Sequence, residues 1–146
     1  MIANIYNAKQ LTQKLKATIQ RSGKLGFTAE TIDQLKLSNE VSIRIASDDT
    51  RKDILYMAVV PRACEDAFPV IKTGIYFYLN TKQLFDEIRM DYTKFNIMFD
   101  LTRCSEADEA IGGECYKMTA RRRRNGWQAY LHIHVRKAHP EPRTDR

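Results

Sequence analysis

Two stretches of the sequence decide the expected fold. Residues 17–46 read ATIQRSGKLGFTAETIDQLKLSNEVSIRIA, and residues 68–102 read FPVIKTGIYFYLNTKQLFDEIRMDYTKFNIMFDLT. Each stretch begins as a short strand, turns at a glycine (Gly23 or Gly74) and returns as a second strand. The same order of elements in both stretches predicts a repeated, β-rich fold.

A helix and two further strands complete each stretch. The helices are expected to start at Thr28 and Asn80, because Thr and Asn side chains can cap the free N–H groups of a first helical turn. Apolar residues then recur at helical spacing, and an alternating strand follows. In the first stretch these residues are Ile32 and Leu35 and then Val41, Ile43 and Ile45; in the second they are Leu84, Phe85 and Ile88 and then Phe95, Ile97 and Phe99. Closing strands are expected at residues 54–60 and 115–124.

The predicted fold class is therefore α+β, mainly antiparallel β with two short helices. It is expected to contain two pseudo-symmetric ββαββ units, residues 17–60 and 68–120, plus a C-terminal β-hairpin at residues 116–136. The alternative is that two β-rich stretches with one helix each are alike by chance. The acidic segment 105–109, which precedes Gly112 and Gly113, is expected to be a mobile hairpin connection.

The composition predicts a single domain over residues 1–137. The chain has 146 residues, of which 43% are hydrophobic, and no apolar run approaches the roughly 18 residues of a membrane span. The first 16 residues lack the apolar segment of a signal peptide, which favours a cytoplasmic protein. The tail at residues 138–146 has two prolines and is expected to be disordered. Three widely spaced cysteines predict reduced thiols.

The charge is distributed unevenly along the chain. The net charge is +6, yet from Lys117 to the end nine Lys or Arg residues stand against two Asp or Glu, and before Lys117 the numbers are fifteen against sixteen. A chain that is balanced over most of its length and basic at one end usually offers that end to an acidic partner.

The basic end reads as a β-hairpin. Asn125-Gly126 between two strand-like runs favours a tight turn, because both central residues of a type I′ turn need a positive φ. This turn would pair Met118 with Ile133 and Tyr116 with Val135. Alternation then puts two sets of side chains on opposite faces. The inward set is Tyr116, Met118, Ala120, Trp127, Ala129, Leu131, Ile133 and Val135, with Arg122 and Arg124 extending it near the turn; the outward set is Lys117, Arg121, Arg123, Tyr130, His132, His134 and Arg136.

A strand face that mixes cations with flat rings predicts nucleic-acid binding, and the ligand can be either DNA or RNA. Arg and Lys neutralise phosphates, and aromatic or imidazole rings stack on unpaired bases. The predicted binding residues on the hairpin are Lys117, Arg121, Arg122, Arg123, Arg124, Tyr130, His132 and Arg136. Two alternatives remain open: a solvated face that discourages edge pairing, and a scaffolding surface for an acidic protein partner.

The sequence offers little for catalysis. No nucleophile elbow, zinc-protease helix, P-loop or dinucleotide fingerprint is present, so a non-enzymatic protein without a cofactor is predicted. His132 and His134 lie two apart on one strand, but no third metal ligand is indicated, and no metal site is predicted. Tyr76 and Tyr78 would share one strand face and Phe77 the other, giving either core and dimer contacts or an accessible aromatic surface.

The segment Gly23-Lys24-Leu25-Gly26-Phe27-Thr28-Ala29-Glu30, continuing to Val41 and Ile43, resembles the AbrB/MraZ type of DNA-binding domain. That resemblance implies a swapped-hairpin β-barrel built from two such units, a DNA-binding regulator, and a binding role for Lys24. The chain departs from the family pattern at Thr28, where a proline is usual. Two ββαββ-like units are also similar to single-strand-binding folds of the Whirly kind. A homodimer is expected, because a small β-rich unit gains burial by association.

Overall fold

The computed structural model describes residues 1–6, 8, 14–51 and 54–124, and within them the chain forms a nine-stranded antiparallel sheet. The spatial order of the strands is β5-β3-β4-β9-β8-β1-β2-β7-β6. The strands are β1 (Lys16–Ile19), β2 (Leu25–Phe27), β3 (Val41–Ser47), β4 (Leu55–Pro61), β5 (Phe68–Pro69), β6 (Ile71–Thr73), β7 (Tyr76–Leu79), β8 (Phe95–Arg103) and β9 (Cys115–Arg124). The expectation of a mainly antiparallel β fold is confirmed.

The sheet curls into a nearly closed barrel, and the seam lies where the chain passes from one outer strand to the other. β5 pairs with β3 and β6 pairs with β7, and only Val70 separates β5 from β6. Val70 is fully buried, and its N–H donates to the carbonyl of Val41 at 3.1 Å. Arg62 Nη1 donates to the carbonyls of Val70 and Asn39, both at 2.7 Å, and so holds the seam from outside.

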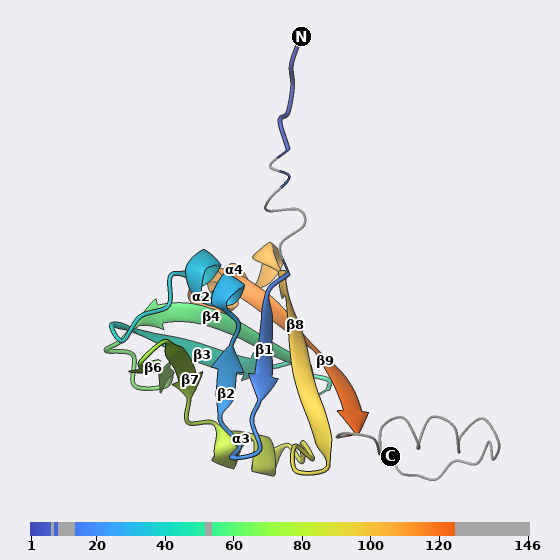
Figure 1. Cartoon of the computed structure of the whole chain (residues 1–146). Coiled ribbons are helices and arrows are strands. Elements are labelled where there is room, and N and C mark those ends of the chain that lie inside the picture. The colour runs from blue at the N-terminus through green and yellow to red at the C-terminus, as the bar shows by residue number, and fades with distance from the viewer. Residues whose placement is uncertain (7, 9–13, 52–53, 125–146) are drawn as a thin grey trace, which may run out of the picture.

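Short helices lie at the two ends of this barrel. They are α2 (Ala29–Leu35), α3 (Lys82–Glu87) and α4 (Asp108–Ile111), with a 3₁₀ turn at Ser105–Ala107 leading into α4. In Figure 1, α2 and α4 are seen at the upper end and α3 at the lower end. The described part of the chain thus has three α-helices where two were predicted.

The additional helix replaces the predicted mobile connection between β8 and β9. Asp108 accepts two hydrogen bonds from Arg103, each at 2.6 Å, and a third from the backbone N–H of Cys115 at 2.8 Å. Ile111 is buried against Ala58 and Cys115 in a small apolar cluster. The acidic composition of the segment therefore reflects an anchored turn: its carboxylate holds the ends of both adjoining strands.

The helix starts were predicted correctly in one case and one residue early in the other. Thr28 is the N-cap of α2, and its hydroxyl accepts from the N–H of Thr31. The second helix is preceded by Thr81 instead of Asn80. The Thr81 hydroxyl is buried and donates to the carbonyl of Gly23 at 2.9 Å, so it ties α3 to the β1–β2 turn instead of capping the helix.

The core fills the barrel interior and follows the predicted alternation. Ile43, Ile97 and Phe99 are fully buried, as expected for the inward positions of β3 and β8. Phe85 of α3 is also fully buried and stacks on Phe99 with the ring centroids 6.0 Å apart. This contact packs α3 directly on β8, the central strand of the sheet.

The predicted hairpin register is wrong at its base. Over Cys115–Met118, β9 pairs with β4, and from Tyr116 to Arg124 it pairs with β8. A strand has two hydrogen-bonding edges, and at Tyr116 and Met118 both are occupied. The expected pairs Met118–Ile133 and Tyr116–Val135 are therefore excluded. The second strand predicted for the hairpin, and the tail at residues 138–146, lie outside the described residues.

Candidate nucleic-acid interface

The two faces of β9 differ as the sequence predicted. Tyr116 and Met118 are buried in the core, with exposed fractions of 7% and 1%. Lys117, Arg121 and Arg123 are exposed on the outer face of the barrel. β9 therefore presents cations outward over its whole second half, where β4 no longer pairs with it.

Five neighbouring strands share this outer face. Figure 1 shows β7, β2, β1, β8 and β9 side by side across the front of the molecule. Cross-strand pairing defines one row of outward positions running from β9 to β7, and a second, shorter row beside it. The first row is Arg121, Met98, Thr18, Gly26 and Tyr78; the second contains Arg123 and Asn96. We call these two rows, together with the outward residues Lys16, Lys24, Tyr76, Asp100 and Lys117 beside them, the outer face.

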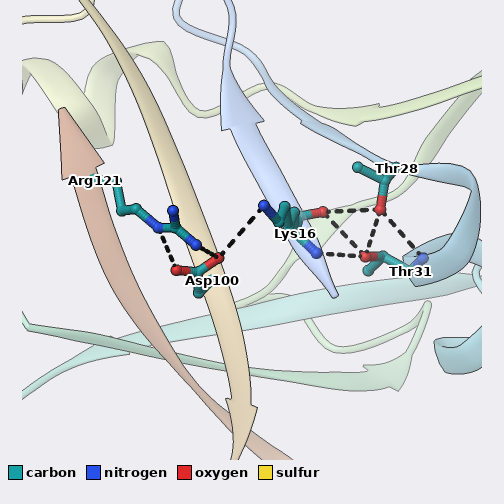
Figure 2. Close-up of polar contacts among 5 residues, drawn as sticks. All are labelled: Lys16, Thr28, Thr31, Asp100 and Arg121. Carbon is teal, nitrogen blue, oxygen red and sulfur yellow. Dashed lines mark hydrogen bonds and ion pairs between the residues drawn. The ribbon is translucent and has the colours of Figure 1, made fainter. Parts of the chain in front are cut away.

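Asp100 connects two cations across the outer face. Arg121 Nε donates to Oδ2 of Asp100 at 2.6 Å, and Nη2 donates to Oδ1 at 3.0 Å. Lys16 Nζ lies 4.0 Å from the same carboxylate, and Figure 2 shows Asp100 between Arg121 of β9 and Lys16 of β1. The hydrogen bonds from Arg121 hold the pKa of Asp100 below its usual range. One carboxylate thus orients two cations, and the group keeps a positive charge.

The backbone of Lys16 is fixed by the start of α2. The buried Thr31 hydroxyl accepts from the Lys16 N–H at 2.8 Å and donates to the Lys16 carbonyl at 3.0 Å. Thr28 lies beside it, with its hydroxyl 2.9 Å from that of Thr31 (Figure 2). The side chain of Lys16 therefore leaves the sheet from a rigid point.

A shallow hollow separates the arginines of β9 from β1. Its cavity volume is about 460 Å³, and it crosses β8 between the two strands; we call it the β8 hollow. It is lined by Lys16, Thr18, Asn96, Met98, Arg121, Arg122 and Arg123. The hollow combines cationic walls with the apolar side chain of Met98, a combination that suits a phosphate backbone with an attached ring.

Lys24 lies on the same outer face, at the β2 side. It alternates with the buried Leu25, and its Nζ is 4.6 Å from the centre of the Tyr78 ring. The predicted binding residues of β9 and Lys24, far apart in the sequence, are thus gathered on one surface with β8 and β1 between them. Tyr76 is 69% exposed, whereas Phe77 packs against the core, so the predicted division of these rings between two faces is confirmed.

The other predicted residues have different positions. Arg122 pairs with the buried Ile97 and follows the core side of β9, but it is exposed because the barrel ends there. It also borders a cavity of about 520 Å³ beside the first residue of β4, together with Arg51, Met90 and Ala120. Arg124 ends β9 opposite Phe95. Tyr130, His132 and Arg136 lie outside the described residues.

Several residues of the outer face were missed from the sequence. Lys16, Asp100 and Met98 were not singled out, although the alternation of β8 gives a signal for two of them. Asn96, Met98 and Asp100 occupy the positions between Phe95, Ile97, Phe99 and Leu101, and so had to face away from the core. Their proximity to Arg121 depends on the register between strands, which alternation does not specify.

Comparison of the chain with protein-family models, with curated protein sequences and with solved structures gave no match. In the part of the chain that the structure describes, no helix has the length and apolar character needed to cross a membrane. Within those same residues, no group of three or more His, Cys, Asp or Glu side chains is arranged to hold a metal ion.

Proposed function

We propose that this chain is a non-enzymatic nucleic-acid-binding protein and that the outer face is its binding surface. One observation carries the proposal: Lys16 of β1, Lys24 just before β2, and the arginines of β9 lie on one continuous sheet face. Among the outward positions of β7, β2, β1, β8 and β9 that the structure describes, Asp100 is the one carboxylate, and it is already paired with Arg121. An anion approaching this face meets positive charge on both sides of the β8 hollow.

The chemistry of the surface favours a polyanion that carries rings. Phosphates are bound by Arg and Lys through charge and hydrogen bonds, and each contact releases a counterion from the nucleic acid. The exposed ring of Tyr76 gives the same face a stacking capacity that an acidic peptide does not require. This combination supports a nucleic-acid ligand over an acidic protein partner.

The finer architecture supports a duplicated origin, with residues 17–60 and 68–120 as equivalent ββαββ units. A non-glycine residue with positive φ follows each helix: Lys36 at 54° directly after α2, and Arg89 at 63° two residues after the last residue of α3. After each, a buried residue donates back to the helix, Leu37 to the carbonyl of Ile32 at 3.0 Å and Met90 to that of Phe85 at 2.9 Å. Lys36 and Arg89, Leu37 and Met90, and Ile32 and Phe85 are each 53 residues apart in the sequence.

The two proposed units are not identical. The units differ at their final strand, since β9 has 10 residues and β4 has 7, and β9 ends in the four consecutive arginines. They also differ before that strand, where the turn at Ser105–Ala107 and α4 cover Ala58 and Cys115. The four arginines of the proposed binding surface are therefore an addition to the second unit, whereas Lys16 and Lys24 lie at the start of the first.

Binding of labelled 20-nucleotide oligomers, single- and double-stranded DNA and RNA, tests this function by fluorescence anisotropy at about 50 mM salt, where multi-phosphate contacts are strong. The double variant Arg121→Ala/Arg123→Ala is expected to bind at least about 10-fold more weakly. A control, Lys36→Asn/Lys94→Ala, removes the same charge away from the outer face and keeps a residue that tolerates positive φ at position 36. Absence of binding by the wild-type chain to every oligomer would refute the proposal, as would equal losses in both variants.

A further inference from the structure

A second, smaller hollow opens on the outer face between β1 and β7. Its cavity volume is about 200 Å³, and Gly26 of β2 forms its floor. The lining residues are Thr18, Gln20, Gly26, Phe27, Thr28, Tyr76 and Phe77. Thr18 also borders the β8 hollow, so the two hollows are neighbours along one surface.

The hollow exists because residue 26 has no side chain. The φ angle of Gly26 is not in the positive range, unlike those of Gly23, Gly74 and Gly112, so the backbone itself does not require glycine here. A Cβ atom would lie 2.8 Å from the side-chain nitrogen of Gln20 and 4.0 Å from the carbonyl oxygen of Phe77. Any larger residue would therefore fill the space between these groups.

The walls of the hollow suit a flat, polar ring. Tyr76 is 69% exposed at the rim, two residues from Tyr78 on the same strand face. Exposing such a ring has no benefit for the core, but it provides a stacking surface. The Gln20 side chain carries an amide that can both donate and accept, and it makes no side-chain hydrogen bond to the described residues, so it is free to pair with a base edge.

The spacing connects this hollow to the arginines. Neighbouring strands lie about 4.8 Å apart, and three steps separate β2 from β9, so Arg121 is about 14 Å across the sheet from Gly26. A backbone of a few nucleotides covers that length. Lys24 is placed beside the hollow and Lys16 midway, which supplies phosphate contacts along the route.

We propose that the ligand is single-stranded nucleic acid, with an unpaired base stacked on Tyr76 in the hollow over Gly26 and its backbone crossing β1 and β8 toward Arg121 and Arg123. This inference rests on the proposed function and deepens it. In a duplex the bases are paired and stacked on one another, so neither the Tyr76 ring nor the Gln20 amide reaches a base without opening the helix.

The test compares single- and double-stranded DNA of the same sequence and length with the full chain. Wild type is expected to bind the single strand at least about 10-fold more tightly. Tyr76→Ala should weaken single-strand binding about 5- to 150-fold, the range seen for loss of one base–aromatic stack, and Tyr76→Phe should retain it. Gly26→Val, which fills the hollow and suits a strand, should weaken single-strand binding at least about 5-fold and leave duplex binding unchanged.

Two controls separate this inference from the proposed function. Thr102→Val alters an exposed position of β8 outside both hollows and should bind like wild type. If duplex is bound as tightly as single strand, or if Tyr76→Ala and Gly26→Val both bind like wild type while Arg121→Ala/Arg123→Ala still loses affinity, the single-strand site is refuted and the binding function stands. Loss of affinity for the single strand in Tyr76→Ala but not in Tyr76→Phe supports the site. Local unfolding of the β6–β7 turn would instead weaken binding in both variants.

Discussion

The buried hydroxyl of Thr31 makes hydrogen bonds to both the N–H and the carbonyl of Lys16. Replacing it by valine preserves the shape of the side chain but leaves the Lys16 N–H without its acceptor, while the Lys16 carbonyl keeps the N–H of Thr28 as a donor at 3.3 Å. We expect Thr31→Val to lower the free energy of unfolding by about 1–3 kcal/mol. Urea denaturation followed by circular dichroism measures this change, with Thr102→Val on exposed β8 as the control, expected to stay within about 0.5 kcal/mol.

Gly23 and Gly74 have the same backbone requirement in different surroundings. Their φ angles are +87° and +63°, so a side chain is strained at either position. A Cβ atom at Gly74 meets nothing within 4 Å, whereas at Gly23 it lies 2.9 Å from the Cα of Lys82 in α3. Gly74→Ala should therefore cost about 1–2 kcal/mol of folding free energy. Gly23→Ala should cost at least about 1 kcal/mol more, because α3 has to move.

The stability of the two variants is compared by the urea concentration at the midpoint of unfolding, provided that the slope of the free energy of unfolding against urea is the same in both. Equal costs at the two positions would show that the contact between the β1–β2 turn and α3 is looser than the structure indicates.

Asp100 stabilises the fold and at the same time restrains two cations of the proposed binding surface. Hydrogen bonds from Arg121 lower its pKa, so its contribution to stability is present above the unfolded-state pKa near 4 and is lost as the pH falls through the lower folded-state value. Asp100→Asn should therefore be less stable than wild type at pH 7, and this difference should shrink as the pH falls and the Asp100 carboxylate becomes protonated in the folded state.

The same substitution should have the opposite effect on binding. Arg121 and Lys16 are released from their shared carboxylate, so affinity for single-stranded oligomers should rise. Each added phosphate contact should steepen the dependence of log K on log salt by about 0.7. Weaker binding by Asp100→Asn would mean that the carboxylate is needed to orient Arg121.

At the scale of elements, Phe85 is the fully buried side chain of α3. Phe85 is fully buried and stacks on Phe99 of β8. Phe85→Ala should cost about 3–5 kcal/mol, because it leaves a cavity at the end of the barrel. Gln83→Ala, on the exposed side of the same helix, is the matched control and should stay within about 0.5 kcal/mol. Thermal unfolding of both variants gives the comparison.

The elements themselves were largely predictable because their signals are local. Alternation identified β3 and β8, and a threonine with a following apolar stripe identified α2. The α4 turn was missed because Asp108 acts through Arg103 and Cys115, contacts that no short window contains. The hairpin base failed for a related reason: alternation assigns the faces of β9 correctly, but it does not say which strand occupies each edge.

At the scale of the whole molecule, the two halves of the chain are interleaved. β1 of the first half pairs with β8 of the second, and β4 pairs with β9. Neither half has a complete sheet of its own, so the chain should unfold in one cooperative transition. Circular dichroism in urea should coincide with labelling of the Cys115 thiol followed by mass spectrometry, because burial raises the pKa of that thiol to about 11 in the folded state. Two separated transitions would contradict this prediction.

The candidate site follows the same logic. The arginines and Lys24 could be named from composition and local pattern, because runs of charge beside strands are visible in sequence. That they share a surface with Lys16, Met98 and Gly26 results from strand order, in which sequence-distant β9 and β1 both pair with β8. Only the assembled barrel brings these residues together.

The arginine extension of β9 has a further consequence for how the protein behaves at high concentration. Beyond Met118 this strand pairs on one side only, with β8, as far as the described residues extend, and an unpaired strand edge is a template for association with another copy. Four successive like charges at residues 121–124 repel such a copy at low ionic strength. Salt at about 1 M shortens the screening length to about 3 Å and removes that protection. Colloidal stability should therefore be best in dilute buffer, so concentrated stocks of this protein should keep longest under the low-salt conditions in which the proposed nucleic-acid binding would be tightest.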